Sequence, residues 1–84
     1  MMKIEIISPD TTLFSGEVEL VTLPGMAGRF TVLDRHAAIV SVLQLGLLLY
    51  RMNGKDYELH ISGGFVEVKN NILSVCIDGL SDTK

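Results

Sequence analysis

The chain has few of the residues that build covalent or catalytic centres. Its 84 residues include one cysteine, Cys76, two histidines and no tryptophan. A single cysteine excludes an internal disulfide framework and any cysteine-rich zinc or iron–sulfur site. His36 and His60 have no carboxylate or second histidine at a spacing typical of metal ligands or of a general base. The sequence therefore predicts no metal site, no cofactor and no catalytic residue.

Long apolar runs and clusters of positive charge are also missing. The longest apolar run, residues 45–50, is interrupted by Gly46 and is much shorter than the roughly 20 residues that span a bilayer. The seven Lys and Arg residues are scattered and the formal net charge is −3, whereas a phosphate-binding surface needs clustered cations. The N-terminus has no continuous apolar segment of the kind found in secretory signals. We expect a small acidic domain in the cytoplasm, with no nucleic-acid partner and no direct bilayer insertion.

One glycine-rich stretch, residues 25–28, could be mistaken for a phosphate-binding loop. No Lys followed by Ser or Thr comes after it, and no helical pattern follows. The two glycines are better explained as part of a turn between strands, where the backbone needs positive φ angles.

Apolar and polar residues alternate with a period of two in several places, including residues 3–6, 17–20 and 29–32. Turn-forming residues at positions 8–10, 15–16, 24–25, 34–35 and 46 divide the chain into strands of about five to seven residues. Residues 37–44 fit either a buried strand or a single helical turn. These patterns predict an all-β domain of two packed sheets.

Two asparagine turns set the register of two hairpins. Asn53-Gly54 favours a two-residue type I′ turn, and Asn70-Asn71 suggests a second tight turn, because asparagine tolerates the left-handed region. Each register pairs complementary side chains across the strands. The first pairs Arg51 with Asp56, Tyr50 with Tyr57 and Leu48 with Leu59; the second pairs Val68 with Leu73 and Val66 with Val75. Between the hairpins, Gly63-Gly64 marks a bulge or a crossing from one sheet to the other.

In their order and spacing, several segments resemble the β-domain of the epsilon subunit of F-type ATP synthases. They are Leu13-Phe14-Ser15-Gly16, Leu23-Pro24-Gly25, Gly28-Arg29-Phe30-Thr31-Val32-Leu33, His36-Ala37 and Gly63-Gly64-Phe65-Val66-Glu67-Val68 with Asn71. The resemblance covers nearly the whole chain.

The resemblance implies a ten-stranded β-sandwich made of two mainly antiparallel five-stranded sheets. It implies a non-catalytic subunit of the central stalk, bound to the gamma subunit and to the c-ring, and only indirectly to the alpha and beta subunits. In that place the chain would couple proton translocation to ATP synthesis. It would be peripheral, on the cytoplasmic face of the bacterial plasma membrane.

The resemblance also assigns two contact sets by position. The residues matching the end of the family's domain that faces the c-ring are Met26, Ala27, Gly28, Arg29, Asp34, Arg35 and His36. The residues matching the region against gamma are Ala37, Ala38, Ile39, Val40, Ser41, Val42 and Leu43. We expect Arg29, Asp34 and Arg35 on adjacent loops, where they would form charge-assisted contacts with a polar ring surface.

Two departures from the family pattern stand out. Ala38 replaces a frequent proline, which removes a constraint on that loop. The chain ends at Lys84, where many members continue into a C-terminal helical hairpin. We therefore expect residues 1–84 to form one domain without that hairpin.

Two other classes of protein remain as alternatives. A lipoyl- or biotinyl-type carrier domain also displays a lysine at a hairpin tip, and Lys55 adjoins the Asn53-Gly54 turn. Its neighbours, Gly54 and Asp56, do not form the usual setting of a modified lysine. A generic β-sandwich that binds peptides at an edge strand is the other alternative.

Overall fold

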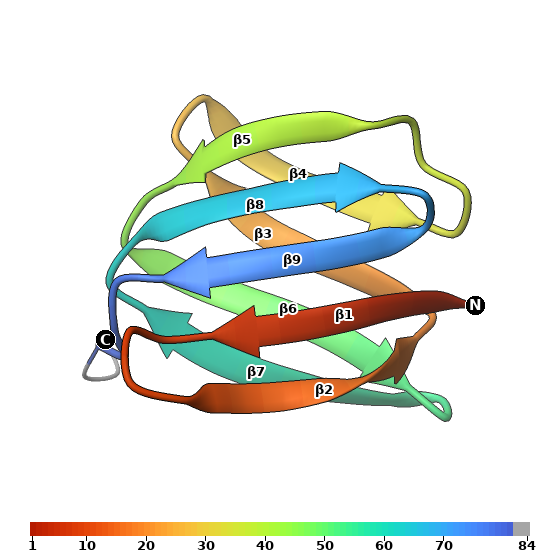
Figure 1. The fold of residues 1–84 in the computed structure, drawn as a ribbon, viewed down its shortest axis with the longest axis horizontal. Helices are drawn as coiled ribbons and strands as arrows, with labels where there is room; N and C mark the ends of the chain where they lie inside the picture. The colour runs from red at the N-terminus through yellow and green to blue at the C-terminus, as the bar shows by residue number, and fades with distance from the viewer. Residues whose placement is uncertain (82–84) are drawn as a thin grey trace.

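The computed structural model describes residues 1–81 and shows a β-sandwich (Figure 1). Within those residues there are nine strands and no helix. They are β1 (Met2–Ile7), β2 (Thr12–Val18), β3 (Leu20–Gly25), β4 (Gly28–Leu33), β5 (Ile39–Leu43), β6 (Gly46–Met52), β7 (Lys55–Ile61), β8 (Gly64–Lys69) and β9 (Ile72–Ile77).

The strands form two layers (Figure 1). The front layer has the order β2-β1-β9-β8-β5, and β4, β3, β6 and β7 lie behind it. The layers are joined at one corner, where Gly25 of β3 pairs with Leu43 of β5. β1 and β9 pair in parallel, and the other pairings are antiparallel. The prediction of an all-β sandwich is therefore confirmed.

The expected strand count differs from the structure. Instead of ten strands in two sheets of five, residues 1–81 contain nine, with five in the front layer and four behind. Between the end of β9 and residue 81, the chain forms one isolated bridge, between Leu80 and Ile61. The last segment of the described chain therefore pairs too briefly to count as a strand.

Both asparagine turns produce the predicted registers. Asn53 and Gly54 have φ of 54° and 75°, and Asn70 and Asn71 have φ of 51° and 64°, as type I′ turns require. All five predicted cross-strand pairs form, three in the first hairpin and two in the second. In the first hairpin the Nε of Arg51 donates to Asp56 at 2.7 Å.

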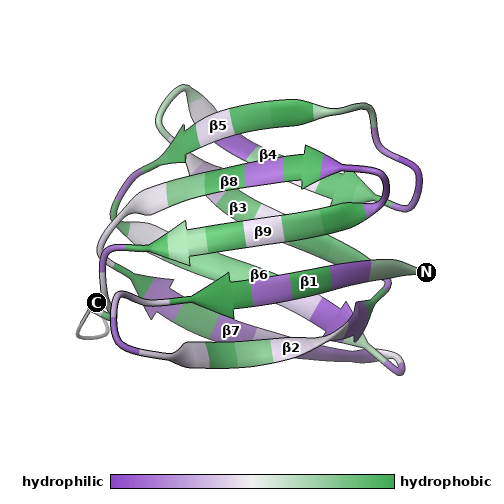
Figure 2. Ribbon diagram, in the orientation of Figure 1, coloured by the Kyte–Doolittle hydropathy of each residue, from purple (hydrophilic) through white to green (hydrophobic). Residues whose placement is uncertain are grey.

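The core lies between the layers and is built from alternate residues of the strands. Its fully buried large side chains are Met2, Ile4, Ile6, Leu23, Leu48, Ile61 and Leu73, with five valines. The ambiguous segment at residues 37–44 contains strand β5, which is hydrophobic along most of its length (Figure 2). Because the chain pairs with β8 here, a helical turn is excluded.

One predicted turn is wrong. Ser15-Gly16 lies inside β2, where these residues pair with Glu5 and Ile4. A Cβ on Gly16 would come within 2.9 Å of the ring of Phe14. The glycine therefore makes room for an aromatic ring on its own strand.

The Gly63-Gly64 pair lies where the chain passes from β7 behind to β8 in front (Figure 1). Both residues have positive φ, 141° and 146°. A Cβ on Gly64 would overlap the carbonyl oxygen of Cys76 and lie 2.8 Å from the Cα of Ile77. The crossing between layers thus depends on a residue without a side chain.

Candidate functional site

The first predicted contact segment lies at the tip of the β3–β4 hairpin. Met26 is 63% exposed, and Ala27, Gly28 and Arg29 are also exposed. The tip is held to the front layer, because the Met26 N–H donates to the carbonyl of Val42. Arg29 also has a structural contact, since its guanidinium donates to the carbonyl of Leu47 at 2.7 Å.

The second contact segment, Asp34, Arg35 and His36, follows the other end of β4. A strand of six residues spans about 20 Å, so it separates these residues from the hairpin tip (Figure 1). The expectation that Arg29, Asp34 and Arg35 lie on adjacent loops is therefore wrong. The seven residues assigned to the c-ring form two surfaces at opposite ends of β4.

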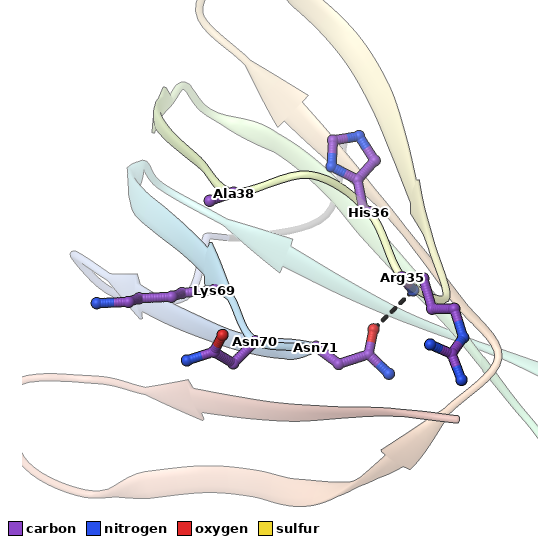
Figure 3. A pocket seen from close by; sticks show the side chains of 6 residues that line it. All are labelled: Arg35, His36, Ala38, Lys69, Asn70 and Asn71. Carbon is purple, nitrogen blue, oxygen red and sulfur yellow. Dashed lines mark hydrogen bonds between the residues drawn. The ribbon is translucent and has the colours of Figure 1, made fainter.

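A side chain that sequence reasoning missed organises the second of these surfaces. The Oδ1 of Asn71 accepts the Arg35 N–H at 2.7 Å, and its Nδ2 donates to Asp34 at 2.6 Å and to the Met1 carbonyl at 3.3 Å. Arg35 has a φ of 65°, a left-handed conformation that is unusual for an arginine. Figure 3 shows the Arg35 and Asn71 bond from close by. Asn71 thus ties the β4–β5 loop to the β8–β9 turn and to the start of β1.

The hydrogen bond from Asn71 lowers the pKa of the Asp34 carboxyl below its ordinary value of 3.8. The N-terminal ammonium and Arg35 also lower this pKa, by smaller amounts. Because the folded pKa lies below the unfolded value, this carboxylate stabilises the fold above the unfolded pKa. The contribution is lost as pH falls through the folded pKa. The side chain is 47% exposed, so solvent weakens the effect.

We therefore predict that an NMR titration of the side-chain carboxyls gives Asp34 a pKa below 3.8. In the Asn71→Ser variant the pKa should move back towards that ordinary value, because the shorter side chain cannot reach the carboxylate. Asp56, whose pKa is lowered by its hydrogen bond with Arg51 in the β6–β7 hairpin, serves as the reference and should titrate at the same pH in both proteins. An unchanged Asp34 titration would show that the amide is not the main cause.

The predicted gamma segment alternates between two environments. Val40 and Val42 point outward and are 72% and 59% exposed, whereas Leu43 is buried at 3% and Ile39 packs against the core. Val42 pairs with Phe65 of β8, which is 48% exposed. We call Val40, Val42 and Phe65 the outer apolar face. Of the remaining predicted gamma residues, Ala37 and Ala38 are exposed and Ser41 is half-buried.

Other candidate groups lie apart from one another. His60 is half-buried on β7 opposite Leu47, Cys76 is half-buried on β9, and Lys55 is exposed at the start of β7. Among residues 1–81, no three His, Cys, Asp or Glu side chains are grouped so that they could hold a metal ion. The part of the chain that the structure describes also has no helix long and apolar enough to cross a membrane.

The fold and the outer apolar face define a small β-sandwich with a surface suited to contact another protein. The family model described as "ATP synthase, Delta/Epsilon chain, beta-sandwich domain" matches residues 1–81, and the chain belongs to this family. The resemblance found in the sequence is thereby confirmed. The family match therefore decides against the alternative of a carrier domain with a modified lysine at Lys55.

Curated relatives agree with the family match. The chain is 40% identical over 77 residues to the ATP synthase epsilon chain of Leptospira interrogans. These residues cover 92% of this chain and 61% of the relative. It is 40% identical over 74 residues to the ATP synthase epsilon chain of Nitratidesulfovibrio vulgaris, covering 88% of this chain and 55% of the relative. The chain thus spans somewhat more than half the length of these relatives.

Solved structures show the same fold. A chain in the central stalk and c-ring structure of the Tetrahymena thermophila mitochondrial ATP synthase matches with a TM-score of 0.82 at 18% identity, covering 96% of this chain and 66% of that one. A chain in the OSCP/F1/c-ring structure of the Euglena gracilis mitochondrial ATP synthase matches with a TM-score of 0.86 at 25% identity, covering 90% and 49%.

Proposed function

We propose that this chain is a non-catalytic subunit of the central stalk of an F-type ATP synthase. In this role it binds the gamma subunit and the c-ring and helps to couple proton translocation to ATP synthesis. It lies on the cytoplasmic face of the bacterial plasma membrane, as a peripheral subunit. The family match over residues 1–81 and the bacterial epsilon chains among its relatives support this proposal.

The observation that carries the gamma contact is the outer apolar face. Val40 and Val42 are 72% and 59% exposed on β5, and Phe65 is 48% exposed on the neighbouring strand. Large apolar side chains gathered on one sheet face mark a surface that another protein covers. Within the segment predicted to contact gamma, Val40 and Val42 make the contact, while Ile39 and Leu43 hold β5 on the core.

The c-ring contact belongs to the β3–β4 hairpin tip. Met26 is 63% exposed there, and Leu45, which follows the segment hydrogen-bonded to the tip, is 66% exposed. Arg29 adds a positive charge beside them. Since Asp34, Arg35 and His36 lie at the other end of β4, we do not assign them to the same ring surface.

Capture from a membrane extract of the source organism tests this function. With the chain as bait, mass spectrometry should identify gamma together with the alpha, beta and c subunits. The Val42→Asp variant should recover at least about tenfold less gamma, because a carboxylate at the centre of an apolar interface loses its hydration without gaining a partner.

Leu33→Asp is the matched control, because Leu33 is an exposed apolar residue, 56% accessible, at the end of β4 in the other layer. It should recover as much gamma as the parent chain. Thermal melting of both free variants should resemble that of the parent. If the parent chain captures no gamma, the proposed function is contradicted. If Val42→Asp captures as much gamma as the parent chain, the outer apolar face is not the gamma contact.

A further inference from the structure

We propose that the rim beside the outer apolar face binds an acidic, extended segment of the partner protein through Arg35 and Lys69. This inference rests on the proposed gamma contact and adds the chemistry of the segment that reaches this end of the sandwich. The relevant feature is an open hollow between the β4–β5 loop and the β8–β9 turn.

The hollow has a volume of about 560 Å³ and is lined by Arg35, His36, Ala38, Lys69, Asn70 and Asn71 (Figure 3). The lining contains two permanent cations, a histidine and two amides, and it contains no carboxylate. This composition differs from that of the chain as a whole, which carries a net charge of −3. The nearby carboxylate of Asp34 is engaged by the Asn71 amide and lies 3.9 Å from the N-terminal ammonium.

Neither cation forms an ion pair within the described part of the chain. Among residues 1–81 the ion pairs are Met1 with Asp34, Lys3 with Glu5, and Arg51 with Asp56. Arg35 and Lys69 take part in none of them. Both are exposed, so their charges are available to a partner.

The backbone at Arg35 indicates that the side chain has a role beyond solubility. Its φ of 65° is a conformation that glycine adopts without steric cost, whereas a side chain makes it unfavourable. The Asn71 amide holds this conformation by accepting the Arg35 N–H at 2.7 Å. An arginine at a position where glycine would be easier therefore places its charge on the rim at a cost in backbone energy.

The placement of the two cations decides between kinds of ligand. Figure 3 shows the side chains of Arg35 and Lys69 on opposite sides of the hollow and pointing apart. They do not converge on one point, as a site for a single small anion requires. A segment that crosses the hollow would meet one cation at each side, which favours a protein segment with more than one carboxylate.

The hollow is continuous with the proposed gamma surface. A second hollow of about 230 Å³ shares Ala38 and Lys69 with the first and is also lined by Val40 of the outer apolar face and by Glu67, which pairs with Val40 across the strands. A partner that covers Val40 therefore passes beside the basic rim. Its segment would place apolar side chains on β5 and acidic ones between Lys69 and Arg35.

Titration of the purified gamma subunit with the 84-residue chain tests this inference, at about 50 mM and about 300 mM salt. Arg35→Gly and Lys69→Gln should each weaken binding by about fivefold at low salt and less at high salt. Arg35→Lys should keep most of the affinity. Lys55→Gln, which removes an exposed charge at the start of β7, is the matched control and should bind like the parent.

Arg35→Gly separates binding from folding, because it relieves an unfavourable φ while it removes the charge. Its melting temperature should equal or exceed that of the parent chain. If Arg35→Gly and Lys69→Gln bind like the parent while Val42→Asp does not, the basic rim has no role and only the proposed function stands. If the parent chain does not bind gamma, the proposed function fails and this inference fails with it.

Discussion

Replacing Gly64 by alanine should lower the free energy of unfolding by about 4 kcal/mol or prevent folding altogether. The new Cβ would overlap the Cys76 carbonyl oxygen and lie 2.8 Å from the Cα of Ile77. Both neighbours are backbone atoms of β9, so no side chain can rotate away to make room. Relief would require β8 and β9 to separate, which would disturb the buried valines and leucine that these strands carry into the core.

Gly54→Ala is the matched control for this variant. Gly54 also has a positive φ, 75°, but a Cβ there would have no atom within 4 Å. It should lose only about 1 kcal/mol, the cost of placing a side chain in the left-handed region. Urea denaturation of both variants measures the difference, and similar losses would show that φ alone, without the clash, determines the effect at Gly64.

Asn71→Ala should lower the free energy of unfolding by about 2 kcal/mol, the second largest effect that we expect. The substitution removes three hydrogen bonds at once, to the Arg35 N–H, the Asp34 carboxylate and the Met1 carbonyl. Arg35 would then hold its φ of 65° without the bond that supports it. The β4–β5 loop should become mobile, which hydrogen exchange of the Arg35 amide would detect.

The adjacent turn residue provides the comparison. Asn70 has nearly the same conformation, with a φ of 51°, but no side-chain hydrogen bond is found for it in the described part of the chain. Asn70→Ala should therefore cost about 1 kcal/mol, from the backbone alone. If the two variants unfold at the same urea concentration, the three bonds of Asn71 contribute nothing measurable.

Local chemistry explains why both hairpins could be predicted from the sequence. A type I′ turn fixes the pairing of the strands on either side of it, so Asn53-Gly54 and Asn70-Asn71 were sufficient to set the registers. Period-two alternation likewise identified the sheet faces. These signals come from residues that are close in sequence and do not depend on the rest of the fold.

The candidate site could be predicted less well, because its contacts join distant parts of the chain. Asn71 reaches Arg35 in the β4–β5 loop and Met1 before β1, and nothing near Asn71 in the sequence indicates these partners. Arg29 and Asp34 do not share a surface because most of the length of β4 separates them, although they are close in the sequence. Ser15-Gly16 predicts a turn because a glycine that accommodates Phe14 within a strand looks the same in the sequence as a turn glycine.

The parallel pairing of β1 with β9 has a consequence for how the chain acquires its fold. β1 lies between β2 and β9, and its parallel ladder begins with Lys3 beside Ile72. A chain emerging from the ribosome can form the β1–β2 hairpin early, but the other edge of β1 stays unpaired until β9 has been synthesised. Pairings between such distant residues slow folding. Until then this edge of β1 is exposed, and unpaired strand edges of incompletely folded chains promote aggregation.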